Sequence, residues 1–69
     1  MINVRELKAQ MTRCGVTQTQ LAKVLDLSYP SVSYKVNGLR DFTREEIIKI
    51  SEFLNLSPEM RDHIFLNSK

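Results

Sequence analysis

Hydrogen-bonding side chains crowd one short segment of the chain, positions 29 to 37. Tyrosine, serine, lysine and asparagine fill most of it, and Val32 and Val36 are its only aliphatic residues, spaced so that one helical face can bury both. Hydroxyl, amide and ammonium groups donate and accept hydrogen bonds at the edges of other molecules. A short helix whose surface is made mostly of such groups is predicted to contact something outside the protein.

A second helix is predicted directly before this segment. Thr17 and Gln20 have the spacing of a capping box, in which each side chain bonds the other residue's backbone N–H. Leu21, Val24 and Leu25 then fall on one helical face. The pattern predicts a helix from about Thr17, with an apolar face that packs inward.

The two predicted helices are joined by a tight turn at Asp26. Aspartate is one of the few residues besides glycine that adopts a positive φ at modest cost. Ser28 is predicted to cap the following helix, and Asn37-Gly38 to end it. Because proline is tolerated only in the first turn of a helix, Pro30 fixes the start of this helix close to Ser28.

This ordered set of residues resembles the helix-turn-helix of the phage repressor/Cro-like (XRE-type) DNA-binding family. Two positions depart from the family pattern: Asp26 stands where a glycine is usual, and Lys35 where many relatives have a large apolar residue. A lysine at that position is expected to lay its stem along the core and send its ammonium outward. The matching elements are Gln18, Leu21-Ala22, Leu25, Leu27, Val32-Ser33, Asn37-Gly38 and the continuation from Leu39 to Ile47.

The resemblance implies an all-α fold, a compact bundle of five short helices like the lambda-repressor DNA-binding domain. We expect a single domain over residues 1–69, with the helix-turn-helix at about 17–37. The helix start and stop signals in the sequence agree with five helices. Further N-terminal caps are predicted at Asn3, Thr43 and Ser57, and helix ends at Gly15 and Asn55. In the first helix the apolar face includes Cys14, which is expected to be a small buried residue.

The implied function is sequence-specific binding of double-stranded DNA by a transcriptional regulator, of the phage or prophage repressor type. The helix at 28–36 would enter the major groove and read base edges. The expected base contacts are Ser28, Tyr29, Pro30, Ser33 and Tyr34, and the expected phosphate contacts are Thr17, Gln18, Lys35, Asn37 and Arg40. For Asn37, the alternative to a phosphate contact is a left-handed C-cap.

An alternative function is a protein-interaction module on the same scaffold, similar to an antitoxin or anti-repressor. Ile64, Phe65 and Leu66 are three adjacent apolar residues, which cannot all face one core. They predict either a protein partner or a weak homodimer through the C-terminal helices.

Charge and composition are consistent with a nucleic-acid partner without establishing one. The net charge is only +2, but residues 1–40 carry six Lys and Arg against two Asp and Glu, whereas residues 41–69 carry four against six. No apolar run is long enough to span a membrane, and the start of the chain lacks the core of a signal peptide. Together with the single cysteine, these features predict that the protein is located in the cytoplasm of a bacterial or phage-infected cell, and on the nucleoid when bound to DNA.

No pattern in the sequence predicts an enzyme, a small-molecule substrate, a cofactor or a metal site. His63 is the only histidine, and neither zinc-ligand spacing nor a nucleophile with its base is present. Glu45 and Glu46 lie at a predicted helix start, where negative charge is favoured by the helix dipole.

Overall fold

The computed structural model describes residues 2–66, and five helices account for most of that range without a strand. The prediction of an all-α fold is confirmed. The helices are α1 (Val4–Cys14), α2 (Gln18–Leu25), α3 (Tyr29–Val36), α4 (Arg44–Phe53) and α5 (Pro58–Phe65).

Polar side chains set where the helices begin. Thr17 and Thr43 open α2 and α4 with complete capping boxes, in which Thr17 pairs with Gln20 and Thr43 with Glu46. In α1, α3 and α5 a single side-chain oxygen caps the first turn, from Asn3, Ser28 and Ser57 respectively. Each cap satisfies a backbone N–H that would otherwise lack a partner, and each was predicted from the sequence.

Four residues with a left-handed backbone end the first four helices. They are Gly15 (φ 69°), Asp26 (φ 57°), Gly38 (φ 80°) and Asn55 (φ 55°). Around each, two backbone hydrogen bonds close the last turn in the pattern of a Schellman motif. The predicted turn at Asp26 is confirmed, and Asn37 is not left-handed (φ −89°), so its alternative as a left-handed cap is wrong.

The core draws apolar side chains from every helix. The fully buried ones are Leu7, Leu21, Val32, Val36, Ile50 and Ile64. Phe42, from the loop before α4, packs edge-on against Phe65 of α5 with ring centroids 5.6 Å apart. The backbone N–H of Asn3 also donates to the carbonyl of Ile64 at 2.7 Å, which ties the start of α1 to α5.

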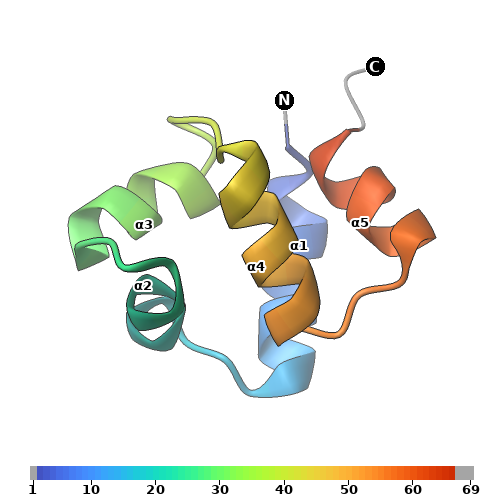
Figure 1. Cartoon of the computed structure of the whole chain (residues 1–69), viewed down its shortest axis with the longest axis horizontal. Coiled ribbons are helices and arrows are strands. Elements are labelled where there is room, and N and C mark those ends of the chain that lie inside the picture. Colours follow the sequence, from blue (N-terminus) through green and yellow to red (C-terminus); the bar gives the residue numbers. More distant parts are fainter. Residues whose placement is uncertain (1, 67–69) are drawn as a thin grey trace.

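The helices α2 and α3 lie at one end of the molecule and α5 at the other, with α1 and α4 between them (Figure 1). Accordingly, α5 packs against α1 and α4, whereas α3 packs against α1 and α2. No helix within residues 2–66 has the length and apolar character needed to cross a bilayer. This arrangement leaves one face of α2 and α3 free of the rest of the protein.

Two expectations about burial need correction. Cys14 is exposed, not buried, because it lies at the edge of the apolar face of α1, and its Sγ donates to the carbonyl of Leu54 at 3.6 Å. Of the three adjacent apolar residues at the end of α5, Ile64 and Phe65 are buried, and only Leu66, which follows the helix and is 64 % exposed, faces solvent. Phe65 is therefore a core residue and is not available to a partner.

Candidate nucleic-acid interface

The turn between α2 and α3 holds the two helices in a fixed relation. The backbone N–H of Leu27 donates to the carbonyl of Ala22 at 2.9 Å, and that of Asp26 to the carbonyl of Lys23 at 3.3 Å. Ala22 is buried, as expected for a small residue at a close approach. Because α3 follows after only three residues, its N-terminal end is set by α2.

The N-terminal end of α3 is open to solvent. Ser28, Tyr29 and Pro30 are all exposed, with Tyr29 at 53 %. Pro30 lies in the first turn, as predicted, where its missing N–H leaves no bond unmade. The Ser28 hydroxyl accepts from the backbone N–H of Ser31 at 3.3 Å and donates to its hydroxyl at 3.0 Å, so Ser31 is bonded locally within the first turn.

Tyr34 lies farther along the same helix and is 46 % exposed. The Arg40 guanidinium stacks over its ring, 5.3 Å from the ring centroid. This cation–π contact connects a predicted base contact with a predicted phosphate contact. Tyr34 and Arg40 therefore form a single exposed unit, built from α3 and the loop after it.

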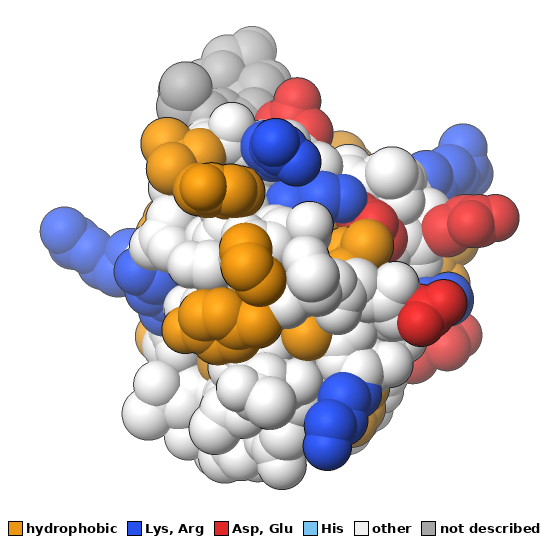
Figure 2. All heavy atoms as spheres, turned by 90° about the vertical axis from the view of Figure 1, so that its left-hand side faces the viewer, with side chains coloured by type: hydrophobic (Ala, Val, Ile, Leu, Met, Phe, Trp, Pro, Cys, Tyr) orange, Lys and Arg blue, Asp and Glu red, His pale blue; other side chains and the backbone are white. Residues whose placement is uncertain are grey.

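Figure 2 shows this end of the molecule as a surface. Apolar and aromatic side chains gather near its centre, lysine and arginine lie toward its margins, and acidic side chains collect at one edge. The lower part of the face, over α2, is mainly polar and uncharged. Such a face offers both hydrogen-bonding and apolar contacts, with positive charge beside them.

Lys35 does not point its ammonium outward, and that expectation is wrong. Its Nζ donates to Oε1 of Glu46 at 2.7 Å, and the two side chains are only 12 % and 13 % exposed. The same oxygen accepts from the backbone N–H of Thr43 at 2.9 Å. Burial raises the pKa of Glu46, but the hydrogen bonds from Lys35 and Thr43 outweigh it and hold the pKa below its ordinary value.

Asn37 is also bonded within the protein. Its Oδ1 accepts from Nζ of Lys8 on α1 at 2.7 Å, and its Nδ2 donates to the carbonyl of Ser33 at 2.7 Å. Ser33 itself is half-buried. The C-terminal end of α3 is thus connected to α1 through Asn37 and to α4 through Lys35.

The start of α2 carries the two remaining predicted phosphate contacts. Thr17 is exposed, and its Oγ1 accepts from the backbone N–H of Gln20 at 3.2 Å. Gln18 is half-buried, and its Oε1 is enclosed without a hydrogen-bond partner among residues 2–66. Free N–H groups and the helix dipole make a helix start favourable for an anion.

Three residues of this region were missed in the sequence. Lys8 and Glu46 are bound to the C-terminal end of α3, and Leu39, at 72 % exposure, stands in the loop between Gly38 and Arg40. Lys8 is 29 residues from Asn37, and Glu46 is 11 from Lys35, so no local pattern indicates either pair. One feature of the sequence indicates that Leu39 is exposed, namely its place in a predicted loop.

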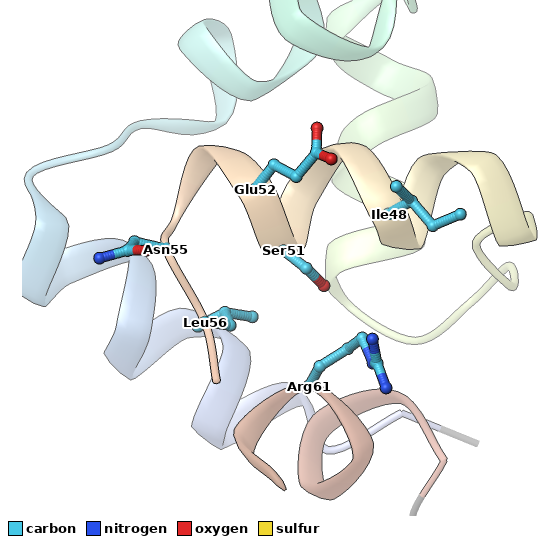
Figure 3. Close-up of a pocket in the computed structure, with 6 residues that line it drawn as sticks. All are labelled: Ile48, Ser51, Glu52, Asn55, Leu56 and Arg61. Atoms are coloured by element: carbon cyan, nitrogen blue, oxygen red, sulfur yellow. The ribbon is translucent and has the colours of Figure 1, made fainter. Parts of the chain in front are cut away.

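Apolar side chains are also exposed on α4 and just after α5. Ile48 and Phe53 on α4 are 46 % and 43 % exposed, and Ile48 and Leu66 both line a hollow of about 510 Å³. A second hollow, of about 290 Å³, shares Ile48 and Arg61 with it. Figure 3 shows the Arg61 side chain reaching from α5 toward α4 across this second hollow.

Comparison with known proteins identifies the architecture. A family model described as Helix-turn-helix matches residues 7–60, which includes all of α2, α3 and α4. No curated protein matches the chain.

Proposed function

Because this chain belongs to the XRE-type, Cro/repressor-like helix-turn-helix family of DNA-binding transcription regulators, we propose that it recognises a specific duplex sequence and acts as a phage- or prophage-type repressor. The observation that carries this proposal is the exposure of Tyr29, Pro30 and Tyr34 on α3. Exposed aromatic and polar groups on a helix that packs by only two fully buried valines are suited to contact with base edges.

In the proposed complex α2 crosses the DNA backbone and α3 enters the major groove with its N-terminal end first. The exposed side chains of α3 then meet the bases, whereas Lys35 and Val36 stay near the protein core. Ser28, Tyr29, Pro30, Ser33 and Tyr34 supply the base contacts, with Pro30 offering an apolar surface to a thymine methyl group.

Phosphate contacts come from the rim of the same face. Thr17 and Gln18 lie at the start of α2, where backbone N–H groups favour an anion. Arg40 is exposed beside Tyr34, and Asn37 follows α3. These contacts hold the register of the protein on the duplex and give affinity that depends on salt.

A repressor of this kind acts by occupying a promoter and needs no chemistry of its own. It works where duplex DNA lies, in the cytoplasm of a bacterial or phage-infected cell and on its nucleoid. Its partner is then the duplex, with no small-molecule substrate.

Selection of bound sequences from random duplexes tests the proposal directly. We expect an enriched motif, and binding to it that weakens steeply with salt, with a slope of about −0.9 in log K against log[salt] per phosphate contact. Arg40→Ala is expected to weaken binding to all sequences alike and to flatten that slope. Absence of an enriched motif would contradict sequence-specific binding.

We also propose weak pairing of two protomers on DNA, since one recognition helix reads too few base pairs to find its site among many competitors. Leu66 and Ile48, exposed on α5 and α4, are the apolar residues available for it. Analytical ultracentrifugation with and without the selected site is expected to show a dimer on DNA that Leu66→Ser weakens. A one-to-one complex that Leu66→Ser leaves unchanged would rule out this surface.

The same exposed residues favour the alternative function, a protein-interaction module like an antitoxin or anti-repressor. In that case the α4–α5 end binds a different protein and α3 plays no part. Variants at Tyr29 and Tyr34 would then leave the activity of the protein in cells intact, and the random-duplex selection would yield no motif.

A further inference from the structure

The pair formed by Lys35 and Glu46 joins the last turn of α3 to the first turn of α4. Oε1 of Glu46 accepts from Nζ of Lys35 and from the backbone N–H of Thr43, at 2.7 and 2.9 Å. The capping box of α4 therefore includes the ammonium group of another helix. A change in the position of α3 relative to α4 must break the ion pair or distort this cap.

Few other contacts fix this end of α3. The helix has eight residues, of which Val32 and Val36 are fully buried. The helix packs against α1 and α2, and its polar connection to α4 is the pair of Lys35 and Glu46. Besides Lys35, the second polar connection at this end is the hydrogen bond from Lys8 to Asn37, between exposed side chains.

The pairing also changes what the charge of Lys35 can do. Its ammonium lies against a carboxylate in a site that is mostly withdrawn from solvent. Such a pair is screened much less by salt than surface charges are, so it persists at ionic strengths that weaken phosphate contacts. Breaking a withdrawn pair leaves one charge without compensation, which disfavours transfer of the ammonium from Glu46 to a DNA phosphate.

We infer that Lys35 and Glu46 are positioning residues, which fix the orientation of α3 for reading DNA, and that Lys35 does not bind a phosphate. The inference rests on the proposed function for its consequence on DNA. It assigns a role in recognition to Glu46, an acidic residue on a helix outside the helix-turn-helix.

Two substitutions distinguish a role in positioning α3 from a direct contact between the Lys35 charge and DNA. Lys35→Met keeps the apolar stem and removes the ammonium, and Glu46→Gln keeps an oxygen for the Thr43 N–H and removes the carboxylate charge. Lys49→Met and Glu45→Gln are the matched controls, since both side chains are exposed on α4. All variants are compared at a temperature where thermal melts show them folded.

On the selected duplex, Lys35→Met is expected to lose several-fold in affinity with its salt slope unchanged, whereas loss of a phosphate contact reduces the slope by about 0.9. Glu46→Gln is expected to lose affinity and base preference as well. Electrostatics alone predicts the reverse, because this variant removes a negative charge from a DNA-binding protein. The double variant is expected to lose no more affinity than whichever single variant loses more, as for two residues that act as one unit.

A measurement without DNA tests positioning independently. The backbone amide NMR signals of residues 29–34 are expected to shift in Lys35→Met and Glu46→Gln and to stay in place in the two controls. A reduced salt slope in Lys35→Met, tighter operator binding by Glu46→Gln, or unmoved amide signals would each overturn the inference. If the parent protein selects no DNA sequence, the proposed function fails, and the amide signals still decide whether the pair positions α3.

Discussion

The two ends of α3 carry similar side chains but use them differently. At the N-terminal end Tyr29 and Pro30 are exposed and contact no other helix through a hydrogen bond within residues 2–66. At the C-terminal end Lys35 and Asn37 are just as polar, yet Lys35 is bonded to α4 and Asn37 to α1. The side chains at the N-terminal end face outward, whereas at the C-terminal end Lys35 and Asn37 are bonded to other helices beside the exposed Tyr34.

This contrast shows that the partner within reach, more than the residue type, decides the role of a polar side chain. Lys35 meets a carboxylate that already serves as a cap, whereas Arg40 stacks on the ring of Tyr34, six residues away, and remains exposed. A charge with a withdrawn partner holds the fold together, and a charge on an exposed ring remains available to DNA.

The largest effect is expected at the two exposed tyrosines of α3. Tyr34→Ala and Tyr29→Ala should each relax preference at particular base positions, by about 1–3 kcal/mol per lost contact. Because both rings are about half exposed, the free energy of unfolding should change by only about 0.5 kcal/mol. Competition between the selected duplex and random DNA measures the first quantity, and urea unfolding the second.

Tyr34→Phe is the control for this prediction. It keeps the ring under Arg40 and removes only the hydroxyl. Loss of base preference in Tyr34→Phe would assign the reading to the hydroxyl, and its retention would assign it to the ring. Equal losses on specific and random DNA in the alanine variants would mean that the tyrosines touch only the backbone.

The next effect is expected at the bonded end, where Gly38 closes α3. Its φ is 80°, and an added Cβ would lie 3.1 Å from Cγ2 of Val4. Gly38→Ala should therefore destabilise the fold by about 1–2 kcal/mol through backbone strain, with a further loss from that contact. Gly15→Ala is a matched control, because Gly15 has φ 69° and open space around its Cα. Equal losses in the two variants would show that the Val4 contact does not matter.

A smaller effect is expected at Asp26, which ends α2 and leads into the exposed end of α3. Its φ of 57° is more strained for a side-chain-bearing residue than for glycine. Asp26→Gly should stabilise the fold by about 0.5 kcal/mol, since relief of strain is partly offset by the greater freedom of glycine in the unfolded chain. Asp26→Ala should destabilise it, and stabilisation by both substitutions would contradict the role of strain.

The fold could be predicted from the sequence because its signals are local. The caps at Thr17, Ser28 and Thr43 depend on residues three positions apart, and the turns at Asp26 and Gly38 on single residues with positive φ. All of these were predicted, and the family match over residues 7–60 confirms the class of protein. Local signals are enough to place five helices in order.

The site could be predicted only in part. The exposure of Tyr29 and the first-turn place of Pro30 follow from the local pattern, but the partners of Lys35 and Asn37 come from other helices. Helical periodicity likewise placed Cys14 on the apolar face of α1, although the structure leaves it exposed at the edge of that face. The predicted DNA contacts themselves stay predictions, since they depend on a partner outside the chain.

The smallest effect is expected in acid, at the ion pair of the bonded end. Burial raises the pKa of Glu46 and the hydrogen bonds from Lys35 and Thr43 lower it by more, so the opposing causes leave a net depression. A carboxyl group with a lower pKa in the folded state stabilises the fold at pH values above its unfolded pKa. That contribution disappears as the pH falls through the folded pKa.

Urea unfolding from neutral to acid pH should therefore show that the free energy of unfolding of the parent protein loses its advantage over that of Glu46→Gln. Glu45→Gln is the control on an exposed neighbour. A difference between the parent and Glu46→Gln that stays constant into acid would mean that the carboxylate charge does not help to hold α3 against α4.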